Sequence, residues 1–234
     1  MIDMDTARLR AKVIETARAM NARGINVNKS GNVSCRAMRG AVTGFLITPT
    51  GVPYEALAPE DLVFMALEEP LSLDCAIGRL SPSSEWEMHA RVYLERPDLC
   101  AVVHTHSAYA TALACQDLPI PAFHYMVASA GGASIDVVPY RTFGTSELAV
   151  AAAAGLRSRN ACLLSHHGVL AAGKSLERAL SLAAEVENLA HQYVIVRSLG
   201  EPKLIEDAEM MRVIDKFRTY GQPQKRLDAG EGKA

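Results

Sequence analysis

The chain has 234 residues, 49% of them hydrophobic and 21% charged, and its 24 Lys and Arg against 26 Asp and Glu give a formal net charge of −2. This is the composition of an ordinary globular chain that can bury a full core. The balanced charge argues against a nucleic-acid or polyanion partner, so any anionic substrate must be small and held by a local site.

The cysteines and the start of the chain bear on its compartment. The five cysteines form no Cys-x-x-Cys motif, and their odd number favours free thiols in a reducing cytoplasm. Charged residues interrupt the first twenty positions, so we expect no signal peptide. No uncharged apolar run is long enough to span a bilayer. We therefore expect a cytoplasmic protein without a membrane partner.

The first third of the chain predicts one helix and three strands. Residues 6–23 place apolar side chains on one helical face, with Thr6 or Asp5 as the cap and Gly24 as the end. Strands are predicted at 33–36, 44–48 and 62–67. Pro and Gly predict a tight loop over 48–53.

The rest of the chain mixes both kinds of element. Helices are predicted at 84–96, 107–115, 122–130, 145–157, 175–198 and 206–218. Strands are predicted at 100–104, 135–138, 162–165 and 169–171. This interspersion, without a linker or a repeat, indicates one α/β domain over residues 1–221, followed by a flexible tail over 222–234. Several strand connections are too short for a crossover helix, so the sheet should be mixed.

Two histidines end a predicted strand. His104 and His106 are two residues apart, so on a strand their side chains project to the same face. The preceding run of Ala101 to Val103 is apolar, and a polar pair at its end needs a partner. Because imidazole is the commonest metal ligand, the pair indicates a metal site. The alternative is two ordinary core or surface histidines.

A second histidine motif follows another short apolar strand. One side chain of His166 and His167, next to Gly168, would supply a third nitrogen. Three nitrogens, with a carboxylate or water in the fourth position, match a catalytic zinc site. This motif is weak when it is considered alone.

Three loops carry residues suited to an anion. Ser83, Ser84 and Glu85 lie at the predicted start of a helix, where free N–H groups attract phosphate, although plain helix capping explains them equally well. Small residues in the loops 30–32 and 50–51 expose backbone N–H groups that can also hold phosphate. Each of these two loops alone is typical of an ordinary turn. Two further histidines, at positions 89 and 191, lie inside predicted helices, and we expect them to be structural.

Taken together, seven short motifs resemble the class II (zinc-dependent) aldolase and epimerase family, most of all its branch acting on fuculose 1-phosphate. Their order and spacing are specific, and the resemblance runs from the first helix to residues 217–221. The motifs are Ser30–Ser34, Ile47–Gly51, Pro82–Glu85, Val103–His106, His124–Tyr125, Phe143–Thr145 and His166–Gly168.

The resemblance implies a fold, an assembly and a set of site residues. The fold would be a three-layer α/β/α domain around a mostly antiparallel sheet, and the assembly a cyclic homotetramer with active sites at subunit interfaces. The implied zinc ligands are His104, His106, His167 and Glu85. The other implied residues are the acid/base Glu85, the neighbouring subunit's proton donor Tyr125, the phosphate contacts Asn32, Thr50, Gly51, Ser83 and Ser84, and the aldehyde-side residues Phe143 and Tyr220.

One residue departs from the family pattern. Lys29 stands in the first phosphate loop where the related aldolases have a small hydroxyl residue. A lysine there can add a point charge to the phosphate, or it can indicate a different substrate branch.

The implied reaction is zinc-dependent retro-aldol cleavage of a deoxy-ketose 1-phosphate to dihydroxyacetone phosphate and a small aldehyde. Fuculose 1-phosphate and 5-deoxy- or 5-methylthio-ribulose 1-phosphate are the substrate types that it suggests, and another divalent metal could replace zinc. The alternatives are a pentulose-phosphate 4-epimerase, a decarboxylase or dehydratase of a related sugar phosphate, and a metal-free structural module. Glu85 favours the aldolase, because the epimerases typically have Asp at this position. The four converging ligands argue against a scaffold.

Overall fold

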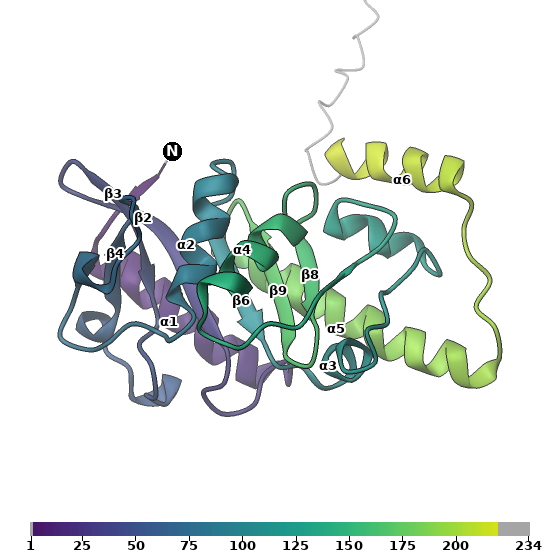
Figure 1. Cartoon of the computed structure of the whole chain (residues 1–234), viewed down its shortest axis with the longest axis horizontal. Helices are drawn as coiled ribbons and strands as arrows, with labels where there is room; N and C mark the ends of the chain where they lie inside the picture. The colour runs from purple at the N-terminus through teal and green to yellow at the C-terminus, as the bar shows by residue number, and fades with distance from the viewer. Residues whose placement is uncertain (1, 220–234) are drawn as a thin grey trace, which may run out of the picture.

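A nine-stranded sheet lies at the centre of the computed structural model, which describes residues 2–219 (Figure 1). Along the sheet the strand order is β5-β4-β3-β2-β6-β9-β8-β7, and β1 pairs with β2. Within the described residues, only the β1–β2 and β7–β8 pairs are parallel, so the predicted mixed, mostly antiparallel sheet is confirmed. The strands are β1 (Asp3–Met4), β2 (Asn32–Arg39), β3 (Val42–Ile47), β4 (Val63–Ala66), β5 (Ala76–Ile77), β6 (Ala101–Thr105), β7 (Val137–Val138), β8 (Ala161–Leu164) and β9 (Gly168–Gly173).

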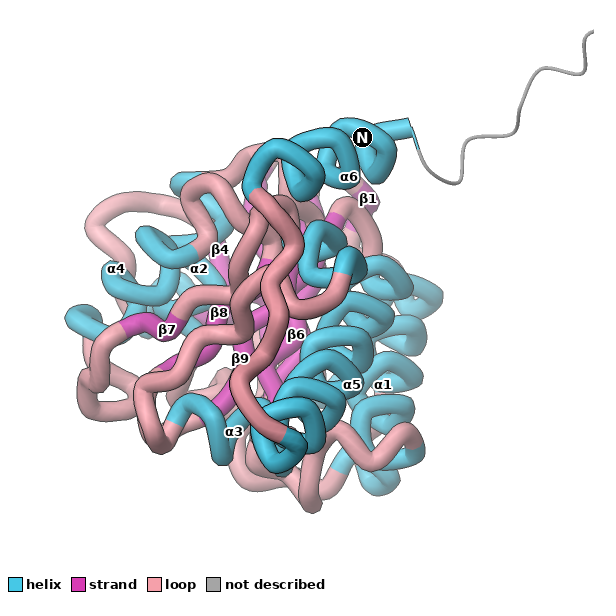
Figure 2. The backbone as a smooth tube through the Cα atoms, turned by 90° about the vertical axis from the view of Figure 1, so that its right-hand side faces the viewer, coloured by secondary structure: helices cyan, strands magenta, loops and turns pink. Residues whose placement is uncertain are grey.

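Helices cover both faces of the sheet and give three layers (Figure 2). One buried cluster joins the sheet to α1, α3 and α5, and a second joins its other face to α2 and α4. Helix α6 packs near the short 3-10 helix η4. The helices are α1 (Ala7–Ala22), α2 (Trp86–Glu95), α3 (Ala108–Ala114), α4 (Ser146–Gly155), α5 (Leu176–Leu199) and α6 (Asp207–Thr219). The 3-10 helices are η1 (Tyr54–Ala56), η2 (Pro59–Asp61), η3 (Leu73–Cys75) and η4 (Tyr125–Ala130).

Most predicted elements are present, and the caps explain where the helices begin. Thr6 and Ser175 cap α1 and α5 by accepting hydrogen bonds from the backbone N–H three residues ahead. The helix predicted over 122–130 is wrong in type: only η4 forms there, and the left-handed Gly131 ends it. The strand predicted over 135–138 is shorter, because Ile135 pairs with Ile120 as an isolated bridge.

The register between β2 and β6 positions the candidate site. Asn32 lies opposite His104 in this antiparallel pair, and successive residues alternate between the two faces of the sheet. The apolar positions of β2, such as Val33, belong to the core beneath α1. Polar residues occupy the alternate positions Asn32, Ser34 and Arg36, and all three are buried.

The sequence also predicts the absence of a membrane span and the presence of a C-terminal tail. None of the helices in the described part of the chain is long and apolar enough to cross a membrane. The predicted tail over 222–234, and with it the domain boundary at 221, lies outside the described residues.

Candidate active site

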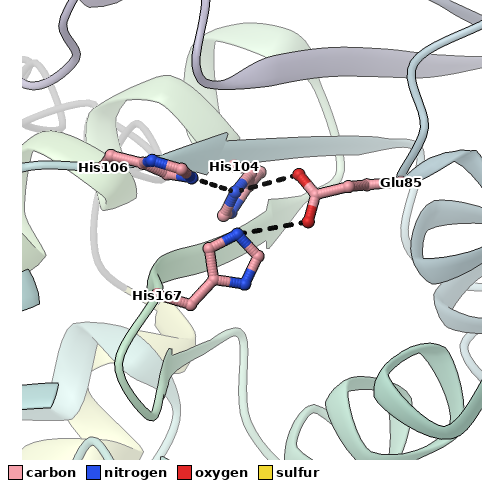
Figure 3. Close-up of side chains that lie close together, drawn as sticks. All are labelled: Glu85, His104, His106 and His167. Carbon is pink, nitrogen blue, oxygen red and sulfur yellow. Dashed lines mark hydrogen bonds and ion pairs between the residues drawn. The ribbon is translucent and has the colours of Figure 1, made fainter. Parts of the chain in front are cut away.

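Four side chains predicted to bind metal meet at one place (Figure 3). Glu85 comes from the start of α2, His104 and His106 from the end of β6, and His167 from the turn between β8 and β9. Their ligand atoms all lie within 4.8 Å of one another. Nε2 of His104 lies 2.9 Å from Nε2 of His106 and 3.2 Å from Oε2 of Glu85, while Nε2 of His167 lies 3.2 Å from Oε1 of Glu85.

The turn before β9 decides which of the two adjacent histidines enters this cluster. His166 adopts a left-handed backbone conformation with φ 53°. The residue is exposed, and the centre of its ring lies 6.0 Å from the centre of the Tyr140 ring. The next residue, His167, points into the cluster (Figure 3). Gly168 follows where β9 approaches β6 so closely that a Cβ would overlap the carbonyl oxygen of Thr105. The local backbone therefore selects His167.

The donor set fits a divalent metal ion. The Nδ1–H group of His104 donates to the carbonyl oxygen of Val169 at 2.8 Å, which leaves its Nε2 lone pair facing the cluster. Oε1 of Glu85 is buried and makes no well-aligned hydrogen bond, although Nε2 of His167 lies 3.2 Å away. Ligand atoms around a tetrahedral zinc ion lie about 3.3–3.4 Å apart, given metal–ligand bonds of about 2.0–2.1 Å. Three separations within the cluster, at 2.9 to 3.2 Å, are close to that spacing, and all the ligand atoms lie within 4.8 Å of one another.

Burial and charge act together on the titration of the cluster. Burial alone would raise the pKa of Glu85, but His104 and His167 outweigh it and hold the pKa well below its ordinary value. Burial alone would lower the pKa of His104, and the carboxylate of Glu85 raises it instead. Burial, together with His104 and His167, lowers the pKa of His106 to about 3. Glu85 is therefore ionised at neutral pH, as a metal ligand or a base requires.

The three loops predicted to hold phosphate come together beside the cluster. The backbone N–H of Thr50 donates to Ser81 at 3.1 Å, and that of Ser83 donates to Thr48 at 3.1 Å. Nζ of Lys29 donates to the carbonyl oxygen of Gly51 at 2.7 Å. Lys29, Thr50, Gly51 and Ser84 are exposed, whereas Ser83 is buried and accepts a hydrogen bond from the backbone N–H of Glu85.

Asn32, predicted as a phosphate contact, is in direct contact with the acid/base candidate. Its Nδ2 donates to Oε2 of Glu85 at 3.0 Å, and its Oδ1 meets Nε2 of His89. Our expectation that His89 is structural misses this contact with the site. The signal that could have found it is the spacing of four residues between Glu85 and His89.

The residues predicted for the aldehyde side are less closely gathered. Phe143 is 67% exposed, and the following Gly144 lies against the carbonyl oxygen of Ser84. Tyr125 is 51% exposed, and its ring lies 4.8 Å from that of His124. Among the described residues, Tyr125 makes no hydrogen bond or ring contact with the four-ligand cluster. Tyr220 lies outside the described residues.

The four ligands lie within a segment that matches a known protein family. The family described as Class II Aldolase and Adducin N-terminal domain matches residues 11–194, which include all four clustered ligands. The chain belongs to the class II aldolase family. The predicted resemblance is thereby confirmed, and the expected three-layer fold agrees with it.

The similarity to individual relatives extends over nearly the whole of this aldolase. It is 47% identical over 213 residues to a 5-methylthioribulose-1-phosphate/5-deoxyribulose-1-phosphate aldolase of Rhodospirillum rubrum, covering 91% of this chain and 92% of the relative. It is 44% identical over 223 residues to the L-fuculose phosphate aldolase of Escherichia coli K12, covering 93% and 98%. A solved L-fuculose 1-phosphate aldolase superposes with a TM-score of 0.85 at 35% identity, covering 92% and 98%.

Proposed function

We propose that this protein cleaves a deoxy-ketose 1-phosphate to dihydroxyacetone phosphate and a small aldehyde, with zinc as its metal. The observation that carries this proposal is the position of the four-ligand cluster beside the loops 29–32, 48–51 and 81–84. A metal and an anion site next to each other suit a substrate whose reacting oxygens and phosphate are a few bonds apart. The printed names of relatives with 47% and 44% identity support both candidate substrate types.

The metal and the acid/base group have separate tasks in this proposal. A divalent ion bound by His104, His106 and His167 would act as a Lewis acid that stabilises negative charge on the ketose oxygens. Glu85 removes a proton from the donor carbon in the synthetic direction and returns it in cleavage. Its lowered pKa keeps it ionised at neutral pH, which is the form that a base must have.

The remaining residues bind and orient the substrate. The phosphate is held by Asn32, Thr50, Gly51, Ser83 and Ser84, and Lys29 adds a positive charge at the exposed rim. These contacts hold the donor half still while the carbon–carbon bond breaks.

The aldehyde half completes the site from a second subunit. Tyr125 of the partner subunit exchanges a proton with the hydroxyl group that becomes the aldehyde oxygen, and Phe143 and Tyr220 line the aldehyde side. A homotetramer would cover the exposed rings of Tyr125 and Phe143, which supports this arrangement. We place the protein in the cytoplasm, because all five of its cysteines are free.

Product analysis tests the proposal. The zinc-loaded protein is incubated with fuculose 1-phosphate, 5-deoxyribulose 1-phosphate and 5-methylthioribulose 1-phosphate, and products are identified by NMR. We expect dihydroxyacetone phosphate from at least one of them, with the matching aldehyde in equal amount. Absence of dihydroxyacetone phosphate from all three would contradict the proposal, as would epimerisation of a pentulose 5-phosphate without release of an aldehyde.

A further inference from the structure

A row of buried polar side chains leads away from Glu85 beneath helix α2. After the contact between Asn32 and Glu85, Oδ1 of Asn32 meets Nε2 of His89, and Nδ1 of His89 lies 2.6 Å from Oγ of Ser34. Oγ of Ser34 lies in turn 2.7 Å from the hydroxyl oxygen of Tyr93. The first four members are at most 5% exposed, and Tyr93 is 1% exposed.

The row exists because two sequence periods match. Glu85, His89 and Tyr93 are four residues apart, so they follow one face of α2 with a rise of about 6 Å per step. Asn32 and Ser34 are two residues apart and follow one face of β2 with a rise of about 6.6–6.8 Å per step. Because helix and strand run in the same direction with nearly equal steps, each helix residue meets its strand partner.

Arg36 fixes the far end of the row. Nε of Arg36 donates to the carbonyl oxygen of Leu99 at 2.7 Å, and its Nη2 donates to that of Tyr93. The guanidinium carbon lies 4.8 Å from the centre of the Tyr93 ring. A cation at the carbonyl end of a helix is favourable. Helix α2 is therefore held against β2 at both ends, and the row has little freedom to slide.

The chemistry of the groups determines the direction of each hydrogen bond. The ionised carboxylate of Glu85 only accepts, so Asn32 must present Nδ2 to it and Oδ1 to His89. Nε2 of His89 must then carry the proton, and Nδ1 accepts from the hydroxyl of Ser34. Ser34 in turn accepts from the hydroxyl of Tyr93. All four hydrogen bonds therefore point toward Glu85.

We propose that His89 is a positioning residue that fixes the amide of Asn32 and, through it, the carboxylate of Glu85. This inference rests on the proposed function of Glu85 in proton transfer. Without the N–H group of His89, no donor holds Oδ1 of Asn32, and the amide is no longer fixed with Nδ2 toward the carboxylate. A rotated amide turns its oxygen toward Glu85 and displaces the carboxylate from the donor carbon. His89 itself stays neutral and transfers no proton.

Two variants of the same residue separate positioning from packing. His89→Gln keeps an N–H group near the place of Nε2, whereas His89→Leu has a similar volume and no donor. We expect His89→Leu to lower kcat about 10- to 100-fold, the usual scale for losing a buried partner of a site residue. KM should change less than kcat, because Thr50, Gly51, Ser83 and Ser84 keep their places when the amide of Asn32 rotates. His89→Gln should restore kcat to within about fivefold of wild type.

Tyr93→Phe serves as the matched control in the same row. It removes the last donor and leaves Ser34 able to donate to His89, so kcat should stay within about threefold of wild type. All rates are expressed per bound metal, and folding is checked by urea denaturation. Equal loss of kcat in Tyr93→Phe and His89→Leu would overturn the proposal, since it would indicate a general effect of the buried row.

A half-reaction gives a readout that needs no aldehyde. Exchange of the donor-carbon proton of dihydroxyacetone phosphate in D₂O, followed by NMR, reports on proton transfer by Glu85 alone. His89→Leu should slow exchange and cleavage by the same factor. Unchanged exchange in His89→Leu, together with loss of exchange in Glu85→Gln, would overturn the role of His89 only. Full exchange in Glu85→Gln would instead overturn the proposed function.

The tautomer of His89 can be observed directly. In ¹⁵N NMR spectra of the wild-type protein at pH 7, its ring should be neutral with the proton on Nε2. A proton on Nδ1 would reverse the hydrogen bond to Asn32 and overturn the proposal.

Discussion

His104 and Val169 are joined across strands β6 and β9 by a hydrogen bond of 2.8 Å from the ring Nδ1–H to the backbone oxygen. This bond fixes the tautomer of His104 and aims Nε2 at the cluster. Since His106 directly follows the end of β6 and His167 directly precedes β9, one pair of strands aligns all three nitrogens. The sheet itself therefore sets the positions of the three nitrogens.

Metal removal is the first prediction. The purified protein should contain about one divalent metal ion per chain, most of it zinc, because three nitrogens and a carboxylate oxygen form a zinc-type donor set. Treatment with a strong chelator should abolish cleavage, and added zinc should restore it. Metal content is measured by mass spectrometry alongside the activity. Full turnover after verified removal of metal would contradict this assignment.

The second prediction concerns Glu85. Glu85→Gln keeps the size of the side chain and removes the base, so kcat should fall by roughly 10²-fold or more. The fold should remain, which circular dichroism can check. Steady-state kinetics with metal content matched to wild type measure the effect. A kcat within a few-fold of wild type would assign proton transfer to another group.

Gly168 supplies a third prediction. A Cβ at Gly168 would overlap the carbonyl oxygen of Thr105 and touch the ring of His106, so Gly168→Ala should push β9 away from β6. We expect destabilisation by about 1–3 kcal/mol, the usual cost of overpacking, together with weaker metal binding. Gly78→Ala is the milder control, because the atoms nearest to its new methyl belong to Val63 at 3.3 Å, whereas the methyl of Gly168→Ala would overlap the oxygen of Thr105. Equal urea midpoints for both variants would refute the prediction.

The sequence predicts the long elements well because their signals are local. The cap of Thr6 and the apolar face of residues 6–23 contain all that α1 needs, and the result agrees to within a residue. Strands β1 and β5 have two residues each and carry no period. They form only because a neighbouring strand offers a free edge, and this is a property of the folded sheet.

In the candidate site, too, the features with a local sequence signal are predictable and those set by distant contacts are not. The spacing of His104 and His106 is enough to place both side chains on one face. The choice between His166 and His167 depends on a left-handed backbone in a turn, which the sequence alone does not reveal. The role of His89 requires the position of Asn32, 57 residues away in the chain. Local patterns identify candidate ligands, and contacts between distant segments decide their geometry.

The fourth prediction concerns stability against pH. Burial and the nearby His104 lower the pKa of His89 from 6.5 to about 3 in the folded state. Below pH 6.5 the unfolded chain gains a proton at His89 that the folded state does not accept, so stability falls as the pH falls. At pH 5, about 1.5 units below the ordinary pKa, the loss in free energy of unfolding is about 2 kcal/mol, since each pH unit contributes about 1.4 kcal/mol.

A variant without the imidazole isolates this contribution. Between pH 7.5 and pH 5, urea denaturation of wild type should show a loss of stability about 2 kcal/mol larger than that of His89→Gln. Other titrating groups act on both proteins and cancel in the difference. Parallel losses in the two proteins would show that His89 is protonated in the folded state as well.

The last prediction is that the enzyme is strict about the phosphorylated ketone and tolerant of the aldehyde. The loops that meet beside the cluster expose the hydroxyl-bearing residues Thr50 and Ser84, and Lys29 adds a charge at their rim. A site of this kind rejects an analogue that leaves its donors unpaired, so dihydroxyacetone without phosphate should fail as a donor. On the aldehyde side, the candidates Phe143 and Tyr125 are broad rings, and an apolar pocket distinguishes one methylene by only about 1–3 kcal/mol. Lactaldehyde, acetaldehyde and glycolaldehyde should therefore all react within roughly two orders of magnitude in kcat/KM, measured in the synthetic direction.

Lys29→Met should raise KM for dihydroxyacetone phosphate with little change in kcat, whereas Lys12→Met, on helix α1, should alter neither. Equal kcat/KM for dihydroxyacetone and its phosphate would refute the phosphate site, and turnover with a single aldehyde would reveal polar recognition on the aldehyde side.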